Sequence, residues 1–383
     1  MTGTHMLHGL ELRSLVSAGG ELRLHLRTMP VPPPADDEIT VRIEASPVNP
    51  SDLGTLLGPV DLASLTRHGD GETAYVTGMI APEHRGRLAG RFGEELRVGN
   101  EAAGIVVEAG GAMRAMIGKR VAMFGGAMYA EYRTINARDC LVLPPGTDPA
   151  KGAAAFVNPL TALGMVEVMR SEGHHALLHT AAASNLGQML NRLCIRDNIP
   201  LVNVVRSAPQ AALLRDAGAA FVCDSSAPDF EEILVAALAE TGATLAFDAV
   251  GGGGLAGRIL SSMEKALDRR AGSYSRYGSA VHKQVYIYGS LDPGPTIIDR
   301  KAGMAWGIGG WLVLPFLERI GPERAARLRE RVIADLGTIF RTRYAREISL
   351  AELLTPETLR ACARNGTGAK MLVNPARRPS ETA

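Results

Sequence analysis

The chain has 383 residues, with 41 basic and 40 acidic side chains and a formal net charge of +1 at pH 7. This balance excludes the basic field of a nucleic-acid-binding protein, and the length indicates two domains rather than one core. The four cysteines, which are Cys140, Cys194, Cys223 and Cys362, show no paired metal-ligand spacing. With no secretory segment and no apolar run long enough to span a bilayer, we expect a reduced, cytoplasmic protein.

The first 150 residues show the alternation of short β-strands. Strands are predicted over residues 21–27, 38–45, 99–110, 118–123 and 127–133, whereas residues 60–98 are polar and predict loops. Several short strands in series predict a small, barrel-like β domain.

A proline-punctuated loop, SPVNPSD, covers residues 46–52. Prolines on either side of Asn49 hold its amide in a fixed place, which suits a binding site. The alternative is a helix N-cap, in which Ser51 or Asp52 caps a short helix over residues 53–57.

After Asp148 the hydrophobic period becomes helical, which predicts a domain boundary near residue 150. Predicted strands over residues 176–180, 201–205, 220–223, 244–250 and 284–290 alternate with helices. This alternation, with glycines 251–254 after a strand, predicts a doubly wound parallel sheet that binds ligands along its carboxyl edge. Residues 321–346 predict an arginine-rich surface helix, and residues 348–354 and 370–373 predict short β segments.

The turn TAAASNLG, residues 180–187, separates the first of these strands from an amphipathic helix. The N–H groups and dipole of a helix that starts directly after such a turn suit a pyrophosphate. The dinucleotide fingerprint has glycines where this chain has Ala182 and Ser184, and it keeps only Gly187. An ordinary βαβ crossover without a ligand is the alternative.

The motifs NPSD, GNEAAG, GKRVA, YAEY, PPG, FDAVG and GAKMLV occur in this order along the chain. Together they resemble the medium-chain dehydrogenase/reductase superfamily, most closely its zinc-free quinone oxidoreductase branch, which includes enone and enoyl reductases. The resemblance implies an α/β fold with a GroES-like β-barrel catalytic domain over residues 1–150. It further implies a doubly wound Rossmann cofactor domain over residues 151–315 and a helix with a return to the catalytic domain over residues 316–383.

A zinc site is not expected. Zinc-dependent members of the superfamily use a cysteine and the histidine of a GHE triplet, but the triplet here is Gly99-Asn100-Glu101 and no cysteine precedes it. An amide is a poor zinc ligand, so we predict hydride transfer to an electron-poor acceptor without a metal.

The charge of the residues after the second strand predicts which nicotinamide cofactor is bound. An NAD site places an acidic residue about 20 residues after the glycine turn, whereas the second strand here ends in Arg206-Ser207. A guanidinium and a hydroxyl suit a 2′-phosphate, which predicts NADPH; a solvent-exposed arginine is the alternative.

Site residues are implied by the resemblance. It places Asn49, Asp52, Tyr129, Asn158 and Thr161 at the catalytic site, although Asn158 could be a helix cap and Tyr129 a core aromatic. The predicted cofactor-binding residues are Thr180, Ala181, Ala182, Ser184, Asn185, Leu186, Gly187, Arg206, Ser207, Cys223, Val250, Gly289, Ser290 and Leu291.

The acceptor is predicted to be a quinone or a related conjugated carbonyl. Enoyl thioester reductases of this branch carry a tyrosine where this chain has Val60, which cannot donate a proton. Tyr277, His282 and Tyr288 could substitute for it, so a 2-enoyl thioester or enone reductase remains an alternative. A non-catalytic NADPH-binding protein is the alternative of another class.

Trp306 and Trp311 lie among glycines in an apolar segment, residues 303–317. Both this segment and residues 273–283 differ from the common pattern of the family. The two tryptophans could form a flat wall for an aromatic acceptor or a subunit interface. We favour the interface and expect a homodimer with a small-molecule substrate and no nucleic-acid or membrane partner.

Overall fold

A computed structural model describes residues 6–271, 275–364 and 370–377. The chain forms two compact units, the first from residues 1–157 and 332–383 and the second from residues 158–331. The predicted domain boundaries at 150/151 and 315/316 lie 7 and 16 residues before these divisions. The mixed α/β fold class is confirmed, with a mainly antiparallel first unit and a parallel sheet in the second.

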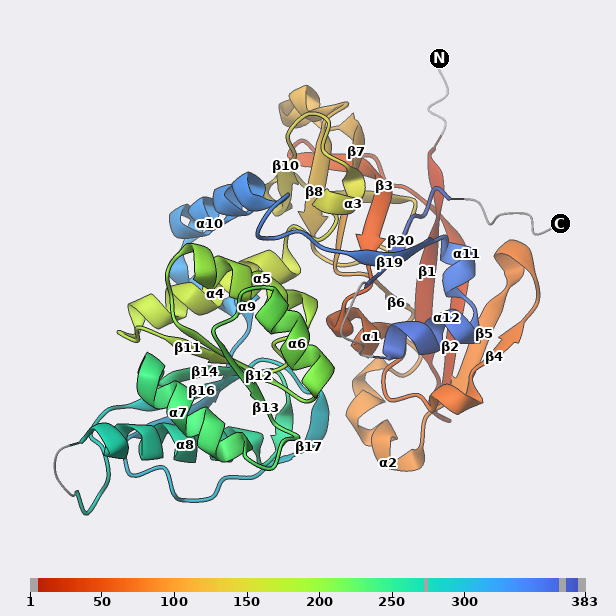
Figure 1. Cartoon of the computed structure of the whole chain (residues 1–383). Coiled ribbons are helices and arrows are strands. Elements are labelled where there is room, and N and C mark those ends of the chain that lie inside the picture. Colours follow the sequence, from red (N-terminus) through yellow and green to blue (C-terminus); the bar gives the residue numbers. More distant parts are fainter. Residues whose placement is uncertain (1–5, 272–274, 365–369, 378–383) are drawn as a thin grey trace. The chain divides into compact units, whose positions relative to one another are not determined.

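The first unit contains two sheets (Figure 1). The first has the order β4-β5-β2-β1-β6, with β4 Thr66–His68, β5 Tyr75–Met79, β2 Glu21–Pro30, β1 His8–Val16 and β6 Leu96–Arg97. The second has the order β10-β8-β7-β3-β20-β19, with β10 Cys140–Val142, β8 Arg120–Phe124, β7 Glu101–Ala109, β3 Glu38–Pro47, β20 Lys370–Val373 and β19 Tyr344–Ile348. A further strand, β9 Tyr132–Asn136, pairs with β3.

Short helices complete the first unit. They are α1 Pro50–Leu56, α2 Pro82–Arg85, α3 Pro149–Gly152, α11 Leu350–Leu353 and α12 Pro356–Ala363. Leucines 12, 22, 24 and 56 form a buried core with Leu353 and Leu359, so the C-terminal helices pack on strands from the start of the chain. This return of the chain is why β20 pairs antiparallel with β3.

Several local predictions in this unit were wrong. Residues 60–98 are not merely loop, because the buried side chains of Leu65, Val76 and Ile80 draw β4, β5 and their neighbours onto the core. Residues 348–354 are mostly helical, because Ser349 and Glu352 form a capping box that starts α11. The strand predicted at residue 127 begins only at Tyr132.

The second unit is built on a six-stranded parallel sheet. Its order is β13-β12-β11-β14-β16-β18, with β13 Phe221–Asp224, β12 Leu201–Val205, β11 Leu177–His179, β14 Leu245–Asp248, β16 Lys283–Ile287 and β18 Trp306–Gly310. The order runs outward from β11 in both directions, so the chain changes direction between β11 and β14. In a parallel sheet this reversal opens a crevice for ligands at the carboxyl ends of the strands. Glycines 251–253 form a short strand, β15, which pairs with β17 Asp292–Thr296.

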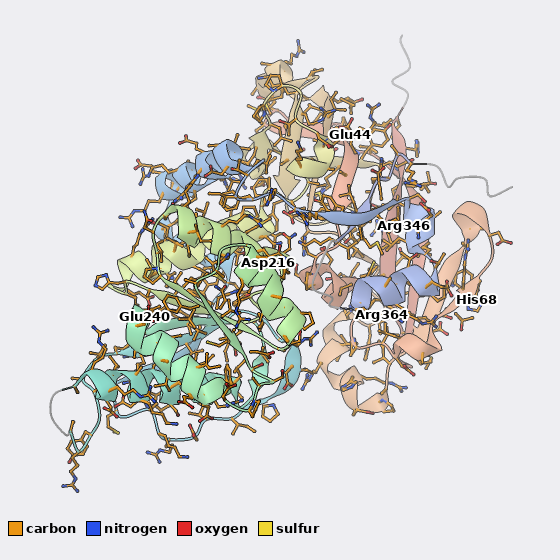
Figure 2. All side chains as sticks on the ribbon, viewed as in Figure 1. Glu44, His68, Asp216, Glu240, Arg346 and Arg364 are labelled. Atoms are coloured by element: carbon orange, nitrogen blue, oxygen red, sulfur yellow. The ribbon has the colours of Figure 1, made fainter. Side chains whose placement is uncertain are left out.

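Helices cover both faces of this sheet (Figure 1). Val204 and Cys223 face α7 Phe230–Thr241 and α8 Leu255–Arg270, whereas Val205 and Val222 face α6 Ala208–Asp216. This alternation follows from the period of two along each strand. Exposed Asp216 and Glu240, labelled in Figure 2, lie on the polar sides of α6 and α7.

Three more helices belong wholly or partly to this unit: α4 Val157–Ser171, α5 Asn185–Arg196 and α9 Val313–Ile320. A fourth, α10 Pro322–Asp335, ends well before residue 346, where the predicted arginine-rich helix was to end. The segment Pro149–Ser171 is long and apolar enough to cross a bilayer, but 89% of its 18-residue apolar window is buried inside the protein. Such burial is typical of a core helix of a globular domain.

The two tryptophans occupy different places in this unit. Trp311 is 6% exposed and packs edge-on against Phe247, with ring centroids 5.3 Å apart, and beside Phe316. Trp306 begins the edge strand β18 and donates its indole N–H to Gly303 O at 3.2 Å. Trp311 is therefore a core aromatic within the unit, and the interface prediction applies only to Trp306.

Candidate functional site

The turn after β11 lies at the carboxyl edge of the parallel sheet. Ser184 is the N-cap of α5, and its hydroxyl oxygen accepts the backbone N–H of Gly187 at 3.1 Å. Ser184 is a predicted cofactor-binding residue, and the acceptor side of its hydroxyl is already used to cap the helix. The first turn of α5 still presents its N-terminal dipole at this edge.

The glycine that the chain keeps is sterically required. A Cβ atom at position 187 would lie 2.1 Å from the carbonyl oxygen of Ala182. The third glycine of the dinucleotide fingerprint serves this same close approach of helix and strand. Ala181, rather than Ala182, carries the left-handed backbone of the turn, with a φ of 50°.

A buried hydrogen-bond network joins this turn to the next strand end. The Thr180 hydroxyl donates to the Asp248 carboxylate at 2.7 Å and accepts the Ala249 N–H at 2.8 Å. Asp248 also accepts the N–H groups of Val250 at 3.0 Å and Gly251 at 3.1 Å. Thr180 is fully buried, so this network shapes the crevice and leaves Thr180 little capacity for a ligand.

The remaining predicted cofactor residues follow other strands of the same sheet. Arg206 is exposed directly after β12, and Ser207 is the N-cap of α6 without a side-chain cap bond. Gly289 follows β16, where a Cβ atom would lie 2.6 Å from Ala249 O. Cys223 is fully buried among core residues, a position that serves packing. Ser290 and Leu291 are exposed in the loop after Gly289.

Asn158 and Thr161 belong to the first turns of α4 and are largely buried. The Asn158 amide donates to the side-chain oxygen of Asn185 at 3.3 Å. Because Asn185 is the first residue of α5, the structure brings two predicted site residues from separate helices together.

In the first unit, Asn49, Asp52 and Tyr129 belong to a buried polar cluster. Asn49 is the N-cap of α1, and its backbone N–H donates to the Asp52 carboxylate at 2.7 Å. The Asn49 side chain donates to Glu101 at 2.8 Å and accepts from Lys370. Both ends of the amide are therefore held inside the cluster. The loop does cap a short helix, as the alternative proposed, but the N-cap residue is Asn49 rather than Ser51 or Asp52.

The Glu101 carboxylate fixes the chain that follows the β domain. Its second oxygen accepts the N–H groups of Phe156 at 3.0 Å and Val157 at 2.8 Å. Burial raises the pKa of Glu101 and lowers the pKa of Lys370, while each charge partly offsets the shift of the other. Glu101 and Lys370 were not predicted as site residues, although both lie in quoted motifs, GNEAAG and GAKMLV.

Asp52 is a buried carboxylic acid of this cluster. Burial raises its pKa to about 7, opposed by the Asn49 N–H and by Lys370. Its second carboxylate oxygen accepts no hydrogen bond from the described residues. The neighbouring Tyr129 hydroxyl donates to Pro47 O at 3.3 Å, and burial raises the pKa of Tyr129 well above its usual value. A carboxyl group with such a pKa can hold or release a proton near neutral pH.

The structure also places the other candidates for proton donation. Val60 is 8% exposed in the core of the first unit, so this position offers no donor. Tyr277 and His282 are exposed. The Tyr288 hydroxyl lies 2.7 Å from Nε2 of His179, whose pKa burial lowers to about 3, so this imidazole is neutral.

No protein-family model matches the chain. Over 206 residues, the chain is 28% identical to the mitochondrial enoyl-[acyl-carrier-protein] reductase of Xenopus tropicalis. This match covers 51% of the chain and 50% of the relative, so it spans about half the length of that curated protein.

Solved structures match nearly the whole chain. A structure described as an NADPH:quinone reductase of Mesorhizobium loti has a TM-score of 0.71 and 24% identity, and the match covers 96% of this chain and 98% of that one. The corresponding protein of Bacillus thuringiensis has a TM-score of 0.73 and 21% identity, with 96% and 99% covered. Escherichia coli quinone oxidoreductase complexed with NADPH has a TM-score of 0.66 and 18% identity, with 96% and 100% covered.

These matches confirm the resemblance that the order of motifs predicted. The chain has the fold of the quinone oxidoreductases and enoyl reductases of the medium-chain dehydrogenase/reductase superfamily. Because fold alone does not fix a reaction, the activity has to be argued from the site residues.

Proposed function

We propose that the chain is an NADPH-dependent oxidoreductase that transfers a hydride to a quinone or a related conjugated carbonyl without a metal. The observation that carries this proposal is the turn between β11 and α5, where Gly187 meets the Ala182 backbone at the switch point of the sheet. In this proposal the second unit is a doubly wound Rossmann domain and the first is a GroES-like catalytic domain.

The residues present fit the cofactor. Gly187 allows the close approach that a pyrophosphate-binding turn needs, and Gly289 allows a second one after β16. The N-terminus of α5 suits the pyrophosphate, and Arg206 with Ser207 suits a 2′-phosphate. The bound nicotinamide would supply the hydride, and the protein would supply binding and orientation.

The buried cluster of the first unit supports reduction without a metal. Inside the cluster, Asn49 is held by Lys370 and Glu101, and outside it Asn100 donates its side-chain amide to the exposed Ser51 at 2.9 Å. These amides are poor metal ligands. The Asp52 carboxyl group, with its pKa near 7, would hold a proton close to neutral pH and act as a local acid.

A second candidate function is 2-enoyl thioester or enone reduction. The observation that favours it is the enoyl-reductase relative, which matches half of the chain. The buried Val60 speaks against it, since the tyrosine of the enoyl thioester reductases is missing there.

An acceptor screen tests the proposal. NADPH oxidation is followed with 1,4-benzoquinone, a simple enone and an enoyl thioester, and we expect the fastest turnover with the quinone. Turnover with the enoyl thioester alone would select the second candidate. Tight NADPH binding without oxidation by any of the three would favour a non-catalytic NADPH-binding protein.

The cofactor assignment has its own test. We expect Arg206→Glu to shift the ratio of NADPH to NADH turnover toward NADH by more than tenfold, since a carboxylate repels a 2′-phosphate and accepts from a 2′-hydroxyl. An unchanged ratio would refute the role of Arg206. A homodimer and a cytoplasmic location remain parts of the proposal, and the mass in solution tests the first.

A further inference from the structure

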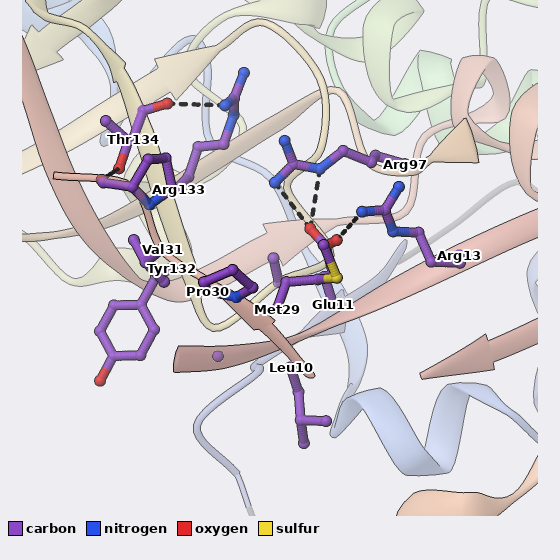
Figure 3. Close-up of a pocket in the computed structure, with 13 residues that line it drawn as sticks. Leu10, Glu11, Arg13, Met29, Pro30, Val31, Arg97, Tyr132, Arg133 and Thr134 are labelled. Carbon is purple, nitrogen blue, oxygen red and sulfur yellow. Dashed lines mark hydrogen bonds and ion pairs between the residues drawn. The ribbon is translucent and has the colours of Figure 1, made fainter. Parts of the chain in front are cut away.

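A small pocket in the first unit is lined by arginines and lies where β1, β2 and β9 meet (Figure 3). Its volume is about 120 Å³. Its lining includes the apolar residues Leu10, Met29, Pro30 and Val31 and the three arginines Arg13, Arg97 and Arg133. Nothing in the proposed reductase reaction uses these residues.

Two of the arginines face each other across the sheet. Arg13 of β1 and Arg97 of β6 are direct partners in the antiparallel register. Like charges at directly opposed positions destabilise a sheet unless an anion lies between them. Glu11, which is 5% exposed, provides one such anion. It accepts from Arg13 through one oxygen, and through the other from Arg97 Nε at 2.9 Å and Nη2 at 2.8 Å.

Arg133 adds a third guanidinium without a carboxylate. It donates to the carbonyl oxygens of Gly126 at 3.3 Å and Thr134 at 2.8 Å, and no ion pair joins it to any described residue. Burial and the charge of Arg97 lower the pKa of Arg133. Figure 3 shows the contrast, with Arg13 and Arg97 turned to Glu11 and Arg133 bonded to Thr134.

The neighbouring carboxylates are engaged elsewhere. Glu38 accepts the N–H of Ala35 at 2.9 Å, Glu131 accepts the N–H of Leu10 at 2.9 Å, and Glu95 pairs with Arg27 and His25. In addition, the Nε of Arg13 is buried and has no hydrogen-bond partner among the described residues. Buried donors of this kind normally have a partner.

We propose that this pocket binds a phosphate group, either as inorganic phosphate or as the end of a small phosphate monoester. Among the lining residues, three guanidinium groups and one carboxylate leave an excess of positive charge, which favours an anion. Guanidinium groups donate charge-assisted hydrogen bonds to phosphate oxygens. The Nε of Arg13 has no partner among the described residues, and Arg133 donates to two carbonyl oxygens but to no carboxylate. A water molecule takes roughly 30 Å³ of liquid volume, so the pocket has room for one small tetrahedral anion.

Isothermal titration calorimetry tests the proposal, with inorganic phosphate, methyl phosphate and acetate as separate probes. Ionic strength is held constant with chloride, because exposed ion pairs are screened by salt. We expect one phosphate to bind per chain and acetate to bind at least tenfold more weakly. Tighter binding of methyl phosphate than of phosphate would identify an ester as the ligand, and the reverse would identify the free anion.

Variants locate the binding. Arg133→Gln should weaken phosphate binding about tenfold or more, since it removes a charge-assisted pair of donors. Arg133→Lys should give an intermediate loss, because it keeps the charge without the planar fork. The exposed Arg138→Ala is the matched control, and unchanged thermal unfolding without phosphate would show that each variant is folded.

Arg206→Ala separates this pocket from the proposed NADPH site. Phosphate binding that persists in this variant and is lost in Arg133→Gln supports the proposal, whether or not the chain oxidises NADPH. Absence of phosphate binding, equal binding of acetate, or loss only in Arg206→Ala would each overturn it.

Discussion

The backbone at Ala182 leaves no room for a side chain at Gly187, since a Cβ atom there would meet the Ala182 carbonyl oxygen at 2.1 Å. Both atoms belong to rigid elements, the strand-end turn and the first turn of α5. A larger residue can be accommodated only if one of these moves, and the helix N-terminus would move with it.

Gly187→Ala should therefore lower the free energy of unfolding by about 3 kcal/mol, because the added methyl group overpacks against the backbone. It should also weaken NADPH binding, because the N-terminus of α5 is displaced. Denaturant unfolding and NADPH fluorescence titration measure the two effects. Gly54→Ala is the control, since a Cβ atom at this position of α1 meets nothing within 4 Å. An equal, small effect of both substitutions would contradict the steric account.

Ala181→Gly should stabilise the protein, in contrast to Gly187→Ala. Ala181 has a φ of 50°, a left-handed conformation that costs a non-glycine residue about 1 kcal/mol. We expect the variant to be more stable by up to about 1 kcal/mol in denaturant unfolding, with part of the gain offset by the entropy of glycine in the unfolded chain. Ala183→Gly, at a position without positive φ, should only destabilise.

Asp52→Asn should change how stability depends on pH. Burial raises the pKa of Asp52 to about 7 from 3.8, so the folded protein binds a proton that the unfolded chain has lost over this range. Wild-type stability from this group therefore falls as pH rises from about 4 to 7, and the variant lacks this loss. Between pH 5 and pH 8, the stability of Asp52→Asn relative to wild type should rise by more than about 1 kcal/mol. A constant difference would show that Asp52 is ionised throughout.

Removing one partner of the Lys283–Glu264 ion pair should destabilise the protein strongly, whereas replacing both partners by neutral residues should destabilise it little. The two side chains are 0% and 5% exposed, and Glu264 also accepts the Ser279 N–H at 2.6 Å. Lys283→Met should destabilise the protein by about 3–5 kcal/mol, because it leaves a buried carboxylate without its cation. Adding Glu264→Gln should recover most of this loss in thermal unfolding. A double variant as unstable as the single one would contradict this reading.

The parallel sheet of the second unit was accessible to sequence reasoning because its signals are local. Short β-rich runs of residues predicted β11, β12 and β14, and the amphipathic period predicted α5. The prediction for residues 60–98 failed because the strands there are short. Val76 and Ile80 are ordered by their contact with the core, which the local sequence does not reveal. Likewise, Arg206 could be placed at a strand end from the sequence, but its neighbours could not.

The sequence by itself determined the alternation of strands and helices in the second unit, the retention of Gly187 and the absence of an acidic residue after β12, since these depend on residues close together in the chain. Only the tertiary structure decided that Asn49 is held between Glu101 and Lys370. It also decided that Thr180 is committed to Asp248 and that Arg13 faces Arg97. Each of these relationships joins residues far apart in the sequence, and their energies depend on burial and distance, which are fixed when the chain packs.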